Sequence, residues 1–131
     1  MTQSLEGGCI CGAVRYRIDG APTYAGNCHC RDCQRAIGAS VVTWVGARYP
    51  DFHVTKGEIT YCSTSPGVQR GFCGHCGTSL TYGGDAWEEL GITAASLDTP
   101  SAITPESNVF LDHRQPWQPY DTALRNYPRF P

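Results

Sequence analysis

Cysteines are the residues of this sequence whose spacing most clearly predicts chemistry. Seven of the eight fall into three tight groups. Thiolates one or two residues apart can turn toward one point, which suits a zinc ion held by sulfur at about 2.3 Å. A disulfide between such close neighbours would be strained, so the spacing predicts metal ligands. The groups are Cys9-x-Cys11, Cys28-x-Cys30-x-x-Cys33 and Cys73-x-x-Cys76.

The number of grouped cysteines predicts two zinc ions per chain, of different kinds. A structural zinc takes four protein ligands, whereas about three are typical of a zinc that keeps a position for a reactant. The first and third groups together would make a closed four-sulfur site that joins an early strand to a late hairpin. The middle group would hold a second zinc with three sulfurs. The ligands are Cys9, Cys11, Cys73 and Cys76 for the first zinc, and Cys28, Cys30 and Cys33 for the second. Gly12 and Gly77 follow the outer groups, where a turn around a metal is expected to need positive φ.

Three alternatives stay open for the residues around these groups. Cys62 stands alone and could supply a fourth sulfur to the second site; otherwise we expect it to be a small buried hydrophobe. His29 and His75 lie between ligands and are expected to point outward. The tetrapeptide Cys73-Gly74-His75-Cys76 matches the redox motif of protein disulfide isomerases. That motif opens a helix, however, and residues 77–82 are β-prone, so zinc ligation is favoured.

The charge of the chain excludes two classes of partner. Ten basic and twelve acidic residues give a formal net charge of −2. Such a chain has no global basic field for a phosphate backbone or an anionic membrane, so we expect no nucleic acid and no membrane partner. The first twelve residues lack the basic and apolar regions of a signal peptide. We therefore expect a cytoplasmic location, where thiols stay reduced.

Length and patterning predict one small, mainly β domain over residues 1–131. A chain of this length has room for one ordinary domain. Val14, Tyr16 and Ile18 alternate with arginines, which is typical of a strand with one buried face. Glycine and proline, spread along the chain, disfavour long helices. About eight strands are expected, over residues 13–18, 39–45, 52–55, 59–62, 68–72, 79–82, 90–95 and 108–111.

Helix is expected to be scarce. A turn or two is predicted over residues 32–37, after the middle cysteine group, and over residues 121–127. Residues 113–131 carry four prolines and predict no regular element, because proline cannot continue a helix or donate to a strand. Aromatic side chains in the same segment indicate that this tail packs on the body of the domain.

Three segments resemble the glutathione-dependent formaldehyde-activating enzyme family, to which centromere protein V also belongs. The likeness extends more loosely to residues 97–98 and 112–117. It implies a β-tent fold of two small antiparallel sheets pinned by zinc, with little helix. It also implies a four-cysteine structural zinc and a three-cysteine catalytic zinc, on the ligands already counted. The segments are Gly8-Cys9-x-Cys11-Gly12-Ala13-Val14, Cys28-His29-Cys30-x-x-Cys33-Gln34 and Gly67-Val68-x-Arg70-x-Phe72-Cys73-x-x-Cys76-Gly77-x-x-Leu80.

The resemblance further implies an activity. The family's named reaction joins glutathione to formaldehyde, and its members are carbon–sulfur lyases. The chain is thereby expected to be a zinc-dependent lyase that adds or removes a small thiol, such as glutathione, at a small aldehyde. Cys28, Cys30 and Cys33 would act through the bound zinc, which can hold a thiol as its thiolate.

The charge on such a site needs nearby donors. Three thiolates on one dication sum to −1, and a bound substrate thiolate makes the sum −2. Arg31, Arg35 and Arg70 are therefore candidates, with Arg70 favoured because it lies in a family-like segment. No carboxylate or histidine is marked by its spacing as a general acid or base. The alternative function is a zinc-stabilised binding module without chemistry, since a fold does not fix a function.

Overall fold

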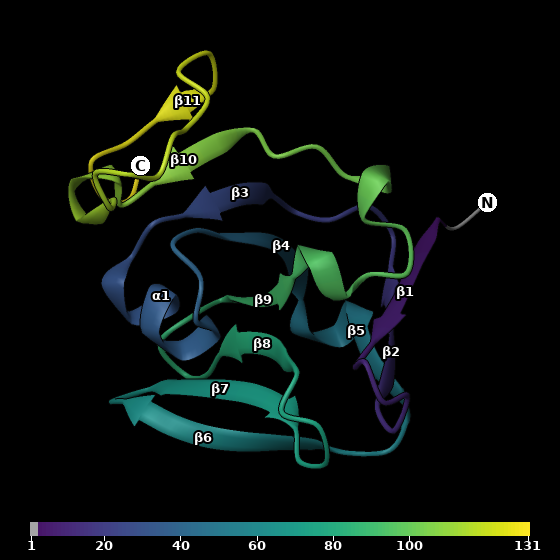
Figure 1. Ribbon diagram of the computed structural model, residues 1–131. Coiled ribbons are helices and arrows are strands. Elements are labelled where there is room, and N and C mark those ends of the chain that lie inside the picture. Colours follow the sequence, from purple (N-terminus) through teal and green to yellow (C-terminus); the bar gives the residue numbers. More distant parts are fainter. Residues whose placement is uncertain (1–2) are drawn as a thin grey trace.

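The computed structural model describes residues 3–131, which form two sheets (Figure 1). The predicted domain begins two residues earlier, and Met1 and Thr2 lie outside the described residues. The smaller sheet is antiparallel, in the order β1-β2-β5. Its strands are β1 (Ser4–Gly8), β2 (Arg15–Asp19) and β5 (Phe52–Lys56). The expected mainly β fold, with two sheets and little helix, is confirmed.

The larger sheet has eight strands in the order β11-β10-β3-β4-β9-β8-β7-β6. Its pairings are antiparallel, except that β10 lies parallel to both β3 and β11. This sheet is therefore larger than expected and of mixed direction at one edge, because the last part of the chain returns to pair beside β3. Its strands are β3 (Ala25–Cys28), β4 (Val42–Arg48), β6 (Ile59–Ser65), β7 (Val68–Cys73), β8 (Ser79–Gly83), β9 (Glu89–Thr93), β10 (Ser107–Val109) and β11 (Arg125–Asn126).

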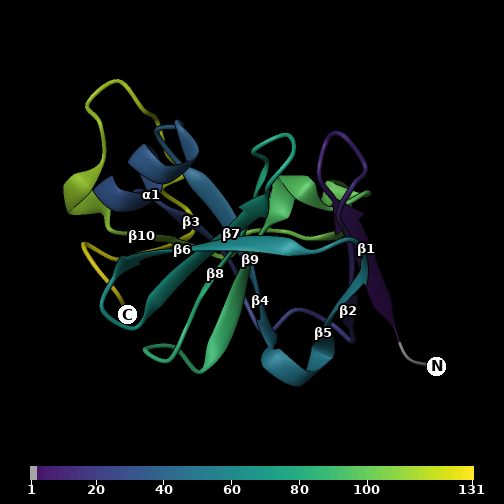
Figure 2. The same ribbon diagram turned by 90° about the horizontal axis from the view of Figure 1, so that it is seen from below.

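Helix in residues 3–131 is limited to α1 (Arg31–Ile37) and four single turns of 3-10 helix. Helix α1 ends at Gly38, whose φ of 75° is the left-handed conformation that glycine adopts without strain. Two views place α1 toward one end of the large sheet and the small sheet across the other end (Figure 1, Figure 2). The single turns are η1 (Tyr49–Asp51), η2 (Ala94–Ser96), η3 (Pro100–Ala102) and η4 (Leu111–His113).

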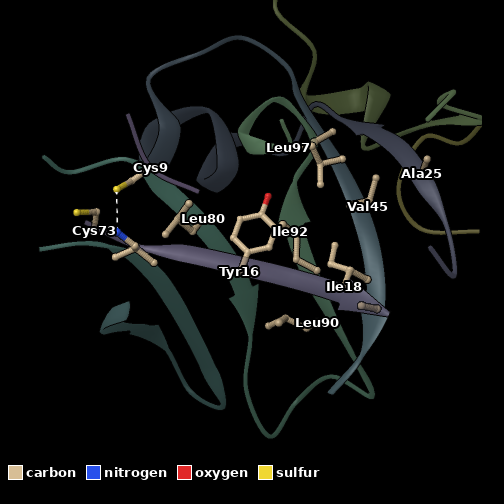
Figure 3. Close-up of a cluster of buried hydrophobic side chains, with 13 residues drawn as sticks. Cys9, Tyr16, Ile18, Ala25, Val45, Cys73, Leu80, Leu90, Ile92 and Leu97 are labelled. Atoms are coloured by element: carbon tan, nitrogen blue, oxygen red, sulfur yellow. Dashed lines mark hydrogen bonds between the residues drawn. The ribbon is translucent and has the colours of Figure 1, made fainter. Parts of the chain in front are cut away.

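The main core lies between the two sheets (Figure 3). Alternate residues of a strand point to opposite faces, and on β2 this places the ring of Tyr16 at 0% exposure. It packs in one cluster with Val45 and Ile92 of the large sheet. Cys9 and Cys73 belong to the same cluster, so the outer cysteine groups lie at the edge of this core.

A second, smaller core lies beside α1. It contains the buried residues Cys28, Cys33, Val42 and Trp44, with Tyr82 packed against them. Trp44 and its neighbour Val45 point to opposite faces of β4, because successive side chains of a strand alternate. The large sheet therefore separates the two cores, and the middle cysteine group lies in the smaller one.

All eight predicted strands are present within a few residues. The sequence did not predict β1, β3 or β11, and the helix predicted over residues 121–127 is wrong. This segment instead turns and forms β11, because Arg125 N–H donates to Glu106 O and Tyr127 N–H donates to Asn108 O. Pairing with β10 satisfies backbone groups that the local sequence alone would leave to a helical turn. The tail is thus mostly, but not wholly, irregular.

Candidate metal centres

The first cysteine cluster joins loops of the two sheets. Cys9 and Cys11 lie in the connection from β1 to β2, Cys73 ends β7, and Cys76 lies in the connection from β7 to β8. All four sulfur atoms lie within 4.8 Å of one another. The Sγ atoms of Cys9 and Cys11 are 3.6 Å apart, and those of Cys11 and Cys73 are 3.8 Å apart.

Both loops of this cluster share a backbone arrangement. Gly12 N–H donates to Cys9 O at 3.1 Å, and Gly77 N–H donates to Cys73 O at 2.8 Å. The φ angles of the two glycines are 80° and 79°, so the positive φ expected at these turns is confirmed. His75 is exposed, and its backbone N–H donates to the sulfur of Cys73.

Hydrogen bonds to sulfur favour the thiolate at two cysteines of this cluster, Cys9 and Cys76. The backbone N–H of Val14 donates to Cys9 Sγ at 3.2 Å, a contact drawn in Figure 3. The hydroxyl of Thr78 lies 3.1 Å from Cys76 Sγ. Together with backbone donors, this hydroxyl lowers the pKa of Cys76 to about 5. Deprotonated sulfur is the form that binds a metal.

The spacing of these sulfurs fits a tetrahedral metal. With zinc–sulfur bonds of about 2.3 Å, tetrahedral geometry puts neighbouring sulfurs about 3.8 Å apart. A disulfide would need about 2.05 Å, and all eight cysteines are free. Four sulfurs close together leave no room for a reactant, so this donor set suits a structural ion.

The second cluster lies where β3 passes into α1. Cys28 is the last residue of β3, Cys30 precedes the helix, and Cys33 lies in its first turn. Their three sulfur atoms lie within 4.8 Å of one another, and Cys28 Sγ is 3.8 Å from Cys33 Sγ. Cys28 and Cys33 are buried against Val42 and Trp44.

Electrostatics favour one thiolate in this second cluster. A hydrogen bond from the thiol of Cys28, together with the Arg70 guanidinium, lowers the pKa of Cys33 to about 6 against the opposing effect of burial. The same hydrogen bond and burial raise the pKa of Cys28. As pH rises, Cys33 is therefore the first of the three cysteines to lose its proton, and it is a thiolate at neutral pH.

Arg70 is the arginine that the structure brings to this cluster. Its Nη2 lies 3.7 Å from Cys33 Sγ, and its Cζ lies 4.6 Å from the centre of the Tyr82 ring. Its other nitrogen, Nη1, is buried and has no hydrogen-bond partner. Arg31 and Arg35, the other candidates from the sequence, are exposed.

Comparison with known proteins shows the family to which this chain belongs. The sequence model of the family described as glutathione-dependent formaldehyde-activating enzyme matches residues 4–113. The chain belongs to this family. A relative from Halomonas elongata, named provisionally as a glutathione-dependent formaldehyde-activating enzyme, is 30% identical over 143 residues. The alignment covers 95% of this chain and 88% of the relative.

The fold has a counterpart among solved structures. A crystal structure of a Rhodobacter sphaeroides protein is similar with a TM-score of 0.61 and 22% sequence identity. The similarity covers 93% of this chain and 98% of the other. It shows that the two proteins share a fold.

The family match ends at residue 113, yet a later residue, Gln115, bonds to Gln34, which directly follows Cys33 of the second cluster. Gln34, 5% exposed, donates its side-chain N–H groups to the carbonyl oxygens of His29 at 2.7 Å and His113 at 3.1 Å. Its oxygen accepts from Gln115 Nε2 at 2.9 Å. Gln34 and residues 112–117 both lie in family-like segments, but the sequence did not predict that these segments bond to each other.

Two sequence expectations near this cluster are wrong. His29 was expected to point outward, but it is 1% exposed, because its ring packs in the interior and lies 6.4 Å from the ring of Tyr120. Cys62 is exposed rather than a small buried hydrophobe, since it lies on β6 near the sheet edge. It also lies outside the group of sulfurs that are within 4.8 Å of one another.

In residues 3–131, no helix combines the length and apolar character needed to cross a membrane.

Proposed function

We propose that this chain is a zinc-dependent carbon–sulfur lyase that joins a small thiol to a small aldehyde such as formaldehyde. In the reverse reaction it releases the thiol from the adduct. Family membership and the name of the Halomonas relative support this class of reaction. The observation that carries the proposal is the cluster of Cys28, Cys30 and Cys33 beside Arg70. Three sulfurs are the donor set of a zinc that also takes a reactant.

The proposal assigns one zinc to each cluster. Cys9, Cys11, Cys73 and Cys76 would hold the structural ion, and Cys28, Cys30 and Cys33 the second one. A zinc ion bound at the second cluster would act as a Lewis acid that lowers the pKa of a thiol. The chain itself would supply the negatively charged thiolate of Cys33 and the positively charged guanidinium of Arg70. The aromatic rings of Trp44 and Tyr82 pack beside them.

The reaction balances without an oxidant or reductant. The sulfur of the substrate thiol forms a bond to the carbonyl carbon, and the C=O π pair moves to oxygen. That oxygen takes up the proton that the thiol lost, which gives a hydroxymethyl thioether when the aldehyde is formaldehyde. Glutathione is the thiol suggested by the family's description. Metal-binding thiols need reducing conditions, so we place the protein in the cytoplasm.

The test is removal of one sulfur from the second cluster. We expect Cys30→Ser to stay folded, to fall from two zinc ions per chain to one, and to lose most of the activity with formaldehyde and glutathione. Cys62→Ser is the matched control for zinc content and should keep both ions, because Cys62 lies outside the clusters. Full activity in folded Cys30→Ser would sink the proposal. A fully zinc-loaded wild type without turnover would favour the alternative, a binding module.

A further inference from the structure

We propose that the cavity beside the second cysteine cluster is a subsite for a small carboxylate, with Arg70 as its anchor. This inference rests on the proposed function and adds the chemical class of one reactant. This cavity, the Arg70 cavity, has a volume of about 260 Å³. Its lining includes Ile37, Trp44, Cys62, Arg70, Phe72 and Thr81.

The charge of the lining points to an anion. Among the described residues that line the Arg70 cavity, Arg70 alone carries a charge. Its Nη2 faces Cys33, whereas its Nη1 is buried without a partner. A ligand oxygen would complete the hydrogen bonding of Nη1.

The guanidinium of Arg70 is held in a fixed orientation. The strand register puts Arg70 between Cys62 of β6 and Tyr82 of β8. Its guanidinium stacks over the Tyr82 ring, with Cζ 4.6 Å from the ring centre. A planar, fixed arginine recognises carboxylates in particular, because its N–H groups match the two carboxylate oxygens.

The remaining walls limit the size and nature of the ligand. Ile37, Trp44 and Phe72 supply apolar surface, and the hydroxyl of Thr81, a residue 2% exposed, is buried without a partner. A volume of about 260 Å³ is below the range of about 300–1,000 Å³ that is usual for drug-sized ligands. The subsite therefore suits a short organic acid, carried either on the thiol or on the aldehyde.

Binding without turnover tests the subsite directly. Zinc-loaded protein is titrated with propionate and with propionamide, its uncharged isostere, and binding is followed by NMR shifts. We expect propionate to bind at least about tenfold more tightly, as loss of a charged hydrogen bond would give. Arg70→Met should remove this preference and Arg70→Lys should restore part of it. Arg35 is an exposed arginine of α1, so Arg35→Met is the matched control and should keep the preference for propionate.

Two results would overturn the inference. One is equal affinity of the wild type for propionate and propionamide, which needs no variant to fold. The other is an unchanged preference in Arg70→Met that retains two zinc ions. Since both are binding results, they leave the proposed lyase reaction standing. Conversely, propionate binding without turnover of any thiol and aldehyde would sink the proposed function alone.

Kinetics distinguish the two sources of the carboxylate. With formaldehyde, 3-mercaptopropionate is compared with 2-mercaptoethanol; with 2-mercaptoethanol, glyoxylate is compared with formaldehyde. If 3-mercaptopropionate has the lower KM in the first pair and Arg70→Met abolishes this difference, the carboxylate belongs to the thiol. The same result in the second pair assigns it to the aldehyde. Absence of an Arg70-dependent preference in both pairs would contradict a role for the subsite in the reaction.

Discussion

Gln34 connects the second cysteine cluster to the C-terminal segment through one buried amide. The amide donates to the carbonyls of His29 and His113 and accepts from Gln115. An apolar replacement would leave these groups buried without partners. We therefore expect Gln34→Leu to lower the free energy of unfolding by about 1–3 kcal/mol. Zinc should also leave the three-sulfur cluster faster, as measured with a chromogenic chelator.

The matched control for this prediction is Gln69→Leu. Gln69 is exposed on β7, so the same chemical change should alter stability by no more than about 0.5 kcal/mol. Zinc release from the four-sulfur cluster should be the same in both variants. Identical release from the three-sulfur cluster in Gln34→Leu and wild type would show that Gln34 does not position it.

Burial of the Tyr16 phenol leads us to expect that the free energy of unfolding falls at high pH. Its ring is 0% exposed, and burial raises its pKa to about 12, although Ser96 Oγ lies within hydrogen-bond distance at 2.7 Å. The pKa of Tyr16 is higher in the folded state than its value of about 10 in the unfolded state. The contribution of the neutral phenol to the free energy of unfolding is therefore complete below pH 10 and is lost as pH rises toward 12. A difference of about two pH units corresponds to about 3 kcal/mol.

Tyr16→Phe removes this titration. We expect the variant to be about 1 kcal/mol less stable at neutral pH, because the hydrogen bond to Ser96 is lost. Between about pH 10 and 12 its stability should fall less steeply than that of the wild type. Urea unfolding at a series of pH values measures both effects. Parallel curves over that interval would contradict the assigned titration.

At the residue scale, sequence spacing predicted the composition of both cysteine clusters, because the cysteines within each group are neighbours in the chain and the ligand count of zinc indicated which groups combine. It could not predict that Gln34 bonds to Gln115, which is 81 positions away. It also misjudged His29, since a place between two ligands does not decide which side of the loop packs inward. The role of Arg70 was suggested by charge, but its contact with Cys33 depends on the register of β7.

At the element scale, the two clusters differ in what they join. The first connects the β1–β2 loop to the β7–β8 loop, and so one sheet to the other. The second lies within the turn from β3 to α1. Metal binding that joins distant elements contributes folding free energy. We expect Cys9→Ser to lower the melting temperature, or the soluble yield, far more than Cys28→Ser.

The measurement is a thermal melt of zinc-loaded protein, with zinc content determined for each variant. Cys62→Ser serves as the control, because it removes a sulfur from neither cluster. Equal destabilisation by Cys9→Ser and Cys28→Ser would contradict the division into a structural and a reactive site.

The sequence predicted those strands whose hydrophobic alternation is strong. It missed strands that form because of their pairing with neighbouring strands. Strand β2 alternates clearly, and its buried face is the one expected. Strand β3 has the sequence Ala-Gly-Asn-Cys, which carries little β signal, yet it forms because β4 and β10 lie on both sides of it. The parallel pairing of β10 is a long-range contact that no local window contains.

At the scale of the whole molecule, the C-terminal tail is tied to the body. Asn108, 1% exposed, donates to Asp121 O and to Asn126 Oδ1. The ring of Phe130 lies 4.8 Å from that of Phe110 and 5.2 Å from that of Trp87. Phe110 packs against the core that holds the second cysteine cluster. We therefore propose that residues 113–131 unfold with the body as one domain.

Phe130→Ala tests this unity. A buried phenylalanine costs about 3–5 kcal/mol when truncated, and Phe130 is 54% exposed, so we expect a loss of about 1–2 kcal/mol. On this proposal the tail and body share one cooperative transition, so the loss should appear in circular dichroism of the whole sheet and not in a separate phase. Trp117→Ala is the matched control: this aromatic residue of the tail is 71% exposed, and its removal should change stability by no more than about 0.5 kcal/mol. An unchanged transition in Phe130→Ala would mean that the tail does not stabilise the body.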